Sequence, residues 1–348
     1  MPACAFLIPG DINLPTGGYA YDRHLLERFP LFGVDVAHVP LPAGFPAPTD
    51  EDLAETTRVL AAITDDAVLL IDGLAYGAMP EIILQAIRQP IVALCHHPLG
   101  LEPGLTPEMA ERLLQSERIA LAHAKAVIVS GDETRGILAD RFAVPLDKLT
   151  VAVPGVSPMP RATGTGTPLA LLAVGSIVPR KGYGGLIAAL AGLKTYDWRL
   201  TIAGADDRHP NEPRHLRRLI AQHQLTDRIE LAGAVDEPTL AHLYAQADVF
   251  ILSSLYEGYG MVLSEAMMRG LPIVTTQCGS AARDMPDSAA LKVQPGNVGE
   301  LAGAIERTLA NAELRGTLAR ASWLAGQQLP RWDETVATVV EVIRKAAA

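Results

Sequence analysis

The chain has 348 residues, of which 49% are apolar and 20% charged, and its formal net charge is −10. This length suits two domains better than one core, and the composition is that of a globular protein, not a disordered or fibrous one. Apart from Arg214–Arg218 there is no dense basic stretch, and we interpret that run as a solvated helix face. The acidic balance argues against nucleic-acid binding, which depends on neutralising phosphates.

The cysteines and the lengths of the apolar runs indicate the cellular compartment. Cys4, Cys95 and Cys278 are far apart and form no C-x-x-C, so neither a disulfide framework nor a zinc site is indicated. The N-terminal sequence lacks the charged region of a signal peptide, and no apolar run has the length of a membrane span. The sequence therefore predicts a cytoplasmic protein without an integral membrane segment.

Short aliphatic runs alternate with amphipathic stretches of helical length. In the first half we expect strands over Ala5–Ile8, Val34–Val39, Ala67–Ile71, Ile91–Leu94, Ala126–Val129 and Leu149–Val153. In the second half we expect them over Leu169–Val174, Arg199–Ala203, Arg228–Leu231, Val249–Leu252, Ile273–Thr276 and Ala290–Val293. Many of these runs are apolar throughout, which is typical of parallel strands buried on both faces. The alternation predicts an α/β protein with doubly wound sheets.

The two series of strands are separated by segments rich in proline, glycine and threonine, at Pro154–Pro158 and Thr163–Pro168. Such composition without periodicity indicates a linker. The predicted division is an N-terminal domain, a C-terminal domain and a terminal helix that packs back on the N-terminal domain, over 1–158, 159–329 and 330–348. Ligands of doubly wound sheets bind at the carboxyl ends of the strands, so we expect the site in a cleft, on residues that directly follow strands.

The most informative segment is Ser253–Ala266, which follows one of these strands. A helix is predicted from about Met261 to Arg269, because Gly270 suits a left-handed cap and a proline follows. Backbone N–H groups of Tyr259, Gly260 and Met261 would gather at the helix N-terminus, where phosphate binds readily.

Two carboxylates flank this predicted phosphate site. Glu257 precedes the helix and Glu265 lies within it. Carboxylates are poor ligands for phosphate but good acceptors for sugar hydroxyls. The segment therefore predicts a ligand that carries both a diphosphate and sugars.

This segment resembles the Glu-x7-Glu motif of retaining glycosyltransferases of the GT-B fold, particularly glycosyltransferase family 4 (group 1), and the resemblance extends over essentially the whole chain. It implies two Rossmann-like domains that face each other across a cleft, with the acceptor on the first and the nucleotide-sugar on the second. It also implies that Glu257 contacts the donor sugar and Glu265 the ribose hydroxyls. Diphosphate and nucleoside contacts are implied for Gly258, Tyr259, Gly260, Met261 and Val262.

A second segment, Val174–Gly182, places Arg180 and Lys181 at a strand end, where two cations would stabilise a departing diphosphate. The segment resembles the family's Gly-Arg…Lys-Gly phosphate clamp. Gly175 and Lys181 match it, but Ser176 stands where the family has arginine. The arginine role is transferred to Arg180, with exposure to solvent as the alternative.

Three further places match the family. Gly17 and Gly18 match a glycine-rich loop that closes over the donor phosphate, and Ala234 and Val235 match a neighbourhood against the nucleobase. The family also carries a histidine that contacts the donor sugar, and His96 and His97 are both candidates for it. Adjacent residues on an extended chain point to opposite faces, and no carboxylate or cysteine at ligand spacing completes a set, so no metal site is predicted.

The predicted reaction is transfer of a hexosyl group, with retention, from a UDP- or GDP-sugar to an acceptor hydroxyl, without a metal or cofactor. The acceptor is expected to be a soluble small molecule or glycan. The alternatives are a GT-B sugar-nucleotide epimerase, a phosphorylase and a nucleotide-sugar-binding protein that has lost catalysis. A dinucleotide-dependent oxidoreductase is disfavoured because Pro9–Asn13 lacks the Gly-x-Gly-x-x-Gly pattern after the first strand.

Overall fold

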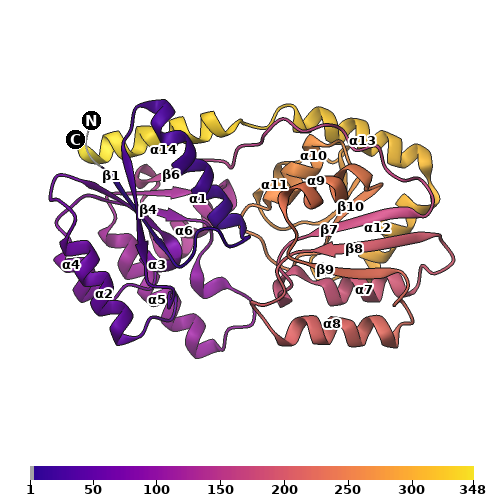
Figure 1. The fold of residues 1–348 in the computed structure, drawn as a ribbon, viewed down its shortest axis with the longest axis horizontal. Coiled ribbons are helices and arrows are strands. Elements are labelled where there is room, and N and C mark those ends of the chain that lie inside the picture. The colour runs from indigo at the N-terminus through magenta and orange to yellow at the C-terminus, as the bar shows by residue number, and fades with distance from the viewer. Residues whose placement is uncertain (1–3) are drawn as a thin grey trace. The chain divides into compact units, whose positions relative to one another are not determined.

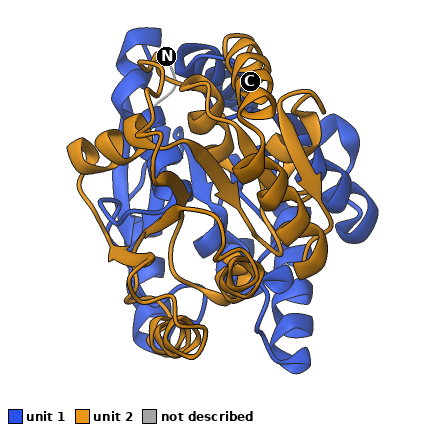
Figure 2. Cartoon of the chain, turned by 90° about the vertical axis from the view of Figure 1, so that its right-hand side faces the viewer, with its two compact units in different colours: residues 1–155, 330–348 blue, residues 156–329 orange. Residues whose placement is uncertain are grey.

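The computed structural model describes residues 4–348 and contains two parallel six-stranded sheets (Figure 1). Each sheet belongs to its own compact unit. The first unit ends at Gly155 and takes in the segment from Pro330 to the C-terminus, and the second comprises Val156–Leu329 (Figure 2). The sequence-based boundaries were placed at 158/159 and 329/330.

The first sheet has the strand order β2-β1-β3-β4-β5-β6, with every pair parallel. Its strands are β1 (Cys4–Pro9), β2 (Val36–Leu41), β3 (Val68–Asp72), β4 (Ile91–Cys95), β5 (Ala126–Val129) and β6 (Leu149–Val151). Every residue of β1, β3 and β4 is buried, as predicted from their unbroken apolar runs. The edge strand β2 starts two residues later than expected, because Val34 bonds through its N–H to Phe29 O in the preceding turn.

Helices cover the first sheet. They are α1 (Gly17–Arg28), α2 (Asp50–Ala61), α3 (Gly73–Tyr76), α4 (Glu81–Ala86), α5 (Pro107–His123), α6 (Asp132–Phe142) and α14 (Trp332–Ala347). The last of these joins this unit through close backbone contact. Thr335 Oγ1 donates to Val153 O at 2.7 Å, and a Cβ at Gly155 would lie only 2.2 Å from Trp332 N. Glycine at 155 therefore lets the start of α14 lie against the chain that leaves β6.

The second sheet has the order β12-β11-β10-β7-β8-β9, the doubly wound arrangement of dinucleotide-binding folds. Its strands are β7 (Leu169–Val174), β8 (Trp198–Ala203), β9 (Ile229–Gly233), β10 (Val249–Leu252), β11 (Ile273–Thr276) and β12 (Ala290–Val293). The strand order reverses between β7 and β10, and ligands of such sheets bind outside the carboxyl ends of the strands at that point. The α/β, two-sheet architecture predicted from the sequence is confirmed.

The second sheet is covered by α7 (Tyr183–Ala191), α8 (Asn211–Gln222), α9 (Glu237–Gln246), α10 (Met261–Met268), α11 (Ser280–Asp284), α12 (Val298–Ala310) and α13 (Ala312–Gly326). The arginines of α8 are exposed, as the sequence indicated for Arg214–Arg218. Within residues 4–348, no helix combines the length and the apolar character needed to cross a membrane.

The segment that enters the second sheet is held by one carboxylate, Asp248, immediately before β10. Asp248 Oδ2 accepts from Ala170 N at 2.8 Å and from Thr165 Oγ1 at 3.0 Å. The N–H of Gly166 also donates to it at 3.2 Å. This threonine- and glycine-rich stretch lacks regular structure but is fixed to the unit that it enters.

Candidate active site

Two loops meet at the strand-order reversal of the second sheet. One follows β7 and contains the short 3-10 helix η4 (Pro179–Lys181), and the other follows β10. Ser253 Oγ donates to Lys181 O at 2.9 Å, and Leu255 N donates to Arg180 O at 2.7 Å. These bonds tie together the loops that carry the predicted phosphate clamp and the first glutamate.

Glu257 lies at the centre of a buried ion cluster. Lys181 Nζ is 2.5 Å from its Oε1, and Arg180 is 3.1 Å from its Oε2. Ser254 Oγ also donates to Oε1, at 2.6 Å. Burial alone raises the pKa of Glu257, but the charges of Lys181 and Arg180 outweigh it and lower that pKa to about 2. The carboxylate is therefore ionised at neutral pH and has two basic side chains beside it. Burial lowers the pKa of Lys181, and the charge of Glu257 opposes that shift.

The position of Lys181 depends on the absence of a side chain at residue 175. A Cβ on Gly175 would lie 2.8 Å from Lys181 Cε, and the backbone there has a φ of 150°. Tyr183 Oη donates to Gly175 O at 2.8 Å and holds this turn. Ser176 is the next residue, and Arg180 pairs with Glu257 although its side chain is 24% exposed, so its role as the clamp arginine stays a prediction.

Helix α10 begins beside this cluster without a side-chain cap. Its N-cap is Gly260, with a φ of 96°, and no side chain bonds the first turn. Uncapped N–H groups and the helix dipole favour an anion at this position. The helix ends one residue before the predicted Arg269, and Gly270 has the expected left-handed conformation, with a φ of 63°.

Glu265 is held separately from Glu257. Its Oε2 accepts a hydrogen bond of 2.8 Å from the hydroxyl of the buried Tyr244. Burial raises the pKa of Glu265, although the bond from Tyr244 opposes this. The remaining predicted residues of this unit, Ala234 and Val235, follow β9, two strands away from β7 on the same edge of the sheet. Sequence reasoning missed Tyr244 because a tyrosine within a helix carries no local mark of a contact 21 residues away.

In the first unit, Gly17 and Gly18 form the first turn of α1, not an irregular loop. Thr16 caps this helix by accepting from Tyr19 N at 3.1 Å. A Cβ on Gly18 would lie 3.1 Å from His96 Cδ2, so the glycine lets the helix approach the histidine.

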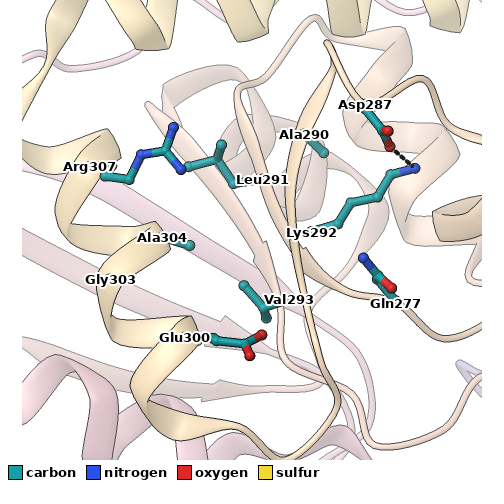
Figure 3. Close-up of a pocket in the computed structure, with 10 residues that line it drawn as sticks. All are labelled: Gln277, Asp287, Ala290, Leu291, Lys292, Val293, Glu300, Gly303, Ala304 and Arg307. Atoms are coloured by element: carbon teal, nitrogen blue, oxygen red, sulfur yellow. Dashed lines mark ion pairs between the residues drawn. The ribbon is translucent and has the colours of Figure 1, made fainter.

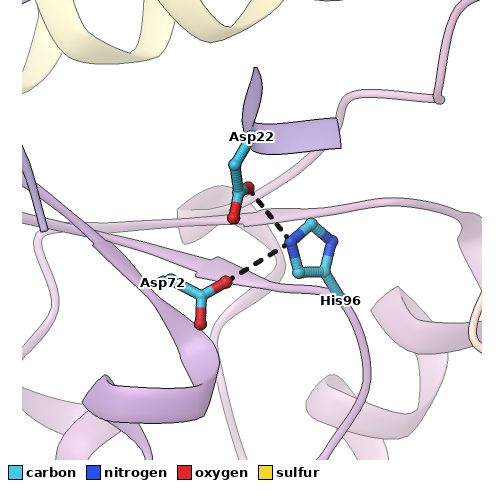
Figure 4. Close-up of side chains that lie close together, drawn as sticks. All are labelled: Asp22, Asp72 and His96. Atoms are coloured by element: carbon cyan, nitrogen blue, oxygen red, sulfur yellow. Dashed lines mark hydrogen bonds and ion pairs between the residues drawn. The ribbon is translucent and has the colours of Figure 1, made fainter. Parts of the chain in front are cut away.

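The two adjacent histidines have different partners, as expected for neighbours on an extended chain. His96 Nε2 lies 3.3 Å from Asp22 Oδ1 and 3.4 Å from Asp72 Oδ2 (Figure 4). His97 Nε2 lies 2.8 Å from Glu102 Oε2. No carboxylate at ligand spacing in the sequence accompanies His96, but in the fold three ligand atoms of Asp22, Asp72 and His96 lie within 4.8 Å of one another. Asp72 is the last residue of the buried strand β3 and could have been found from its place at a strand end, whereas Asp22 lies within α1 and could not.

A separate cavity of about 510 Å³ lies in the second unit beside β12 and α12 (Figure 3). Its polar lining includes Lys292, which pairs with Asp287 at 2.9 Å, and the side chains of Glu300 and Arg307. None of the residues predicted for donor binding lines this cavity.

The comparisons with known proteins agree with this geometry. Residues 160–322, almost all of the second unit, match the family model described as glycosyl transferases group 1. The chain is 28% identical over 325 residues to an MMP alpha-(1->4)-mannosyltransferase of Mycolicibacterium hassiacum, covering 88% of this chain and 77% of that protein. It is 28% identical over 260 residues to a D-inositol 3-phosphate glycosyltransferase of Pseudarthrobacter chlorophenolicus, covering 70% of this chain but only 61% of that relative.

Solved structures show the same fold across the chain. Sucrose-phosphate synthase from Thermosynechococcus elongatus matches with a TM-score of 0.84 at 21% identity, over 99% of both chains. Anabaena HepE in complex with UDP-glucose matches with a TM-score of 0.77 at 18% identity, over 98% of this chain and 100% of that one. The chain is thus a glycosyltransferase with the GT-B fold, which transfers a sugar from a nucleotide-sugar, and its second unit matches the group 1 (family 4) enzymes.

Proposed function

We propose that this enzyme moves a hexosyl group from a UDP- or GDP-sugar to an acceptor hydroxyl, with retention at the anomeric carbon and without a divalent metal. The observation that carries the proposal is the cluster of Arg180 and Lys181 around Glu257, beside the uncapped N-terminus of α10. Two fixed cations and a helix N-terminus supply positive charge where a diphosphate leaves, which is the largest charge change in the reaction.

The different binding roles proposed for Glu257 and Glu265 follow from their different hydrogen-bond partners. Glu257 is ionised and fixed by three donors, so it presents an oriented carboxylate edge to a sugar hydroxyl. Glu265 accepts a hydrogen bond from Tyr244, lies within reach of the charge of Arg269 and is assigned to the ribose hydroxyls. In this proposal both glutamates bind substrate hydroxyls. Neither acts as the general acid or the nucleophile that paired carboxylates supply in glycosidases.

Relatives support the donor class without fixing the sugar. HepE is described in complex with UDP-glucose, and the Mycolicibacterium relative is described as a mannosyltransferase. For this chain the proposal covers UDP- and GDP-hexoses, with a soluble small molecule or glycan as acceptor and the cytoplasm as compartment. An epimerase, or a protein that binds the donor without transfer, is the competing function.

The test measures unfolding temperature for the wild type and Glu265→Ala with UDP-, GDP-, ADP- and dTDP-sugars. A ligand at about a hundred times its dissociation constant stabilises the folded state by roughly 2.7 kcal/mol. We expect one nucleotide series to stabilise the wild type and to have little effect on the variant. If no nucleotide-sugar stabilises the wild type, the proposal is wrong.

The productive donor is then incubated with candidate acceptors before and after dialysis against EDTA. Formation of an α-linked product from an α-linked donor, at the same rate after dialysis, is the expected result. A donor that is converted to its epimer with no glycoside formed would identify the competing function. Activity lost on dialysis and restored by Mn²⁺ or Mg²⁺ would contradict the metal-free reaction.

A further inference from the structure

The imidazole of His96 pairs with two buried carboxylates, Asp22 and Asp72, that have no role in the proposed reaction as described above. Asp22 comes from α1, Asp72 from the end of β3, and His96 directly follows β4 (Figure 4). The side chains of Asp22 and Asp72 are 0% and 3% exposed, whereas that of His96 is 21% exposed. The carboxylates thus lie behind the ring, and the histidine alone reaches solvent.

The contacts of Asp22 serve His96 and little else. Its Oδ1 pairs with the ring, and its buried Oδ2 has no hydrogen-bond partner within residues 4–348. In Figure 4 this second oxygen points toward the carboxylate of Asp72. A buried carboxylate is unfavourable unless it is paired, and the described hydrogen-bond partner of the Asp22 carboxylate is His96.

Asp72 combines two contacts. Its Oδ1 accepts from Leu74 N at 2.8 Å and begins α3, while its Oδ2 faces His96. The hydrogen bond from Leu74 N fixes the orientation of the carboxylate, so Oδ2 is held in place against the imidazole ring. The ring is also bounded by Tyr21, edge-on at 5.2 Å, and by Gly18, where a Cβ would touch it.

The charges of this cluster favour a proton on the ring. Two carboxylates that both face one nitrogen repel each other unless a cation lies between them. Burial lowers the pKa of His96, but the hydrogen bonds and charges of Asp22 and Asp72 outweigh it and raise that pKa to about 10. Burial raises the pKa of Asp22 to about 7, and the charges of His96 and of the neighbouring Arg23 on α1 oppose that shift. Nε2–H is then shared by both carboxylates, and Figure 4 shows the other ring nitrogen on the far side, away from them.

We propose that Asp22 and Asp72 are positioning residues that hold His96 as an oriented imidazolium, so that its Nδ1–H is always a donor toward a hydroxyl oxygen of the sugar substrate. A neutral ring with Nε2–H would offer a lone pair at Nδ1 and would accept from the same hydroxyl. The two carboxylates therefore decide whether Nδ1 of His96 donates or accepts the hydrogen bond with the sugar hydroxyl. The proposal rests on the proposed glycosyl transfer for its substrate, but the state of the ring can be measured without any substrate.

The first experiment follows the histidine rings by ¹⁵N NMR in the ligand-free full chain, with His96→Gln to assign the signal. We expect both nitrogens of His96 to stay protonated above pH 8 in the wild type. Asp22→Asn should lower the ring's midpoint by at least about one pH unit, because one neutralising charge is lost. The matched control is Glu102→Gln, which should move the His97 signal and not that of His96.

The second experiment measures kcat/KM for transfer against pH in Asp22→Asn and Asp72→Asn. At low pH, where the ring is protonated in every variant, we expect kcat/KM close to that of the wild type. As the pH rises, kcat/KM of the variants should fall at a lower pH than that of the wild type. A variant that loses activity equally at all pH values, with a lowered unfolding temperature, would show a merely structural role and overturn the proposal. So would a neutral His96 at pH 7 in the wild type.

The same three side chains could also bind a divalent cation, and this outcome would overturn the proposal too. Titration of the metal-stripped protein with Zn²⁺ and Mn²⁺ is expected to show no binding that depends on Asp22. If the ring is protonated as expected but no nucleotide-sugar is used, the proposed function fails while the arrangement of the cluster stands.

Discussion

The hydroxyl of Tyr244 donates a hydrogen bond of 2.8 Å to Glu265 Oε2, and the guanidinium of Arg269 lies over the same tyrosine ring at 4.3 Å from its centroid. Tyr244 is fully buried at the inner face of α9, and Glu265 lies in α10. The tyrosine therefore fixes the rotamer of a carboxylate that comes from a different helix. A ribose that binds to Glu265 meets an acceptor already in place.

Removing this hydroxyl should weaken donor binding and leave the chemical step intact. We expect Tyr244→Phe to raise KM for the nucleotide-sugar about tenfold or more, with kcat almost unchanged, because a hydrogen bond to a charged group contributes roughly 1.5 kcal/mol or more net. The control is Tyr196→Phe, which removes an exposed bond to Glu306 and should leave KM unaltered. A kcat that falls while KM stays constant would contradict the assignment of Glu265 to the nucleoside.

Lys181 and Glu257 should affect stability and catalysis in different ways. Lys181→Met leaves a buried carboxylate with Arg180 as its remaining cation, which should destabilise the fold by about 3 kcal/mol. Adding Glu257→Gln removes the buried carboxylate charge, so the double variant should regain most of the lost free energy of unfolding but remain at least about a hundredfold slower in transfer. Urea unfolding and initial rates measure the two effects.

Each outcome of that comparison is informative about the cluster. If the double variant is as unstable as Lys181→Met, the lost stability comes from packing of the lysine stem and not from the ion pair. If it transfers sugar at the rate of the wild type, the cluster supports the fold and plays no part in departure of the diphosphate.

The fold could be predicted because its signals are local. Every expected strand is present, since fully buried parallel strands are continuous apolar runs bounded by turn residues. The errors also have local causes. Val34 is apolar but belongs to the turn after Gly33, and the pair Gly17–Gly18 reads as a loop although Thr16 caps a helix there.

The site could be predicted only in part, because its partners are distant in sequence. Glu257 and Lys181 were found through motifs, each within its own loop, but their ion pair joins residues 76 apart. The carboxylates around His96 show the same limit, since Asp22 is 74 residues away and sits on a helix with no distinguishing pattern. Spacing identifies the loops that carry chemistry, whereas tertiary packing decides which side chains face each other.

Asp248 should anchor the segment that enters the second unit. Replacing it with alanine removes bonds from Thr165, Gly166 and Ala170, and we expect a loss of about 2–3 kcal/mol in the free energy of unfolding because bonds to a carboxylate are lost together. Asp287→Ala, which removes an exposed carboxylate paired with Lys292, should change it by no more than about 0.5 kcal/mol. Equal effects of the two substitutions would show that the Asp248 bonds do not hold this segment.

Glu117 should make the stability of the enzyme fall as the pH rises from about 4.5 to about 8. This side chain of α5 is buried, with Oε2 accepting from Leu99 N at 3.0 Å, and burial raises its pKa from 4.5 to about 8. Between these values the folded state holds a proton that the unfolded state has released, so stability declines as pH rises through this window.

Glu117→Gln removes that titration and keeps the shape of the side chain. Compared with the wild type, the variant should lose less free energy of unfolding between pH 6 and pH 9, because an uncharged amide has nothing to ionise in the apolar surroundings. The matched control is Glu111→Gln, an exposed position on the same helix, which should follow the wild-type profile. Parallel pH profiles for the wild type and Glu117→Gln would mean that Glu117 titrates alike in the folded and unfolded chain. In that case its bond to the Leu99 amide would fully offset the effect of burial.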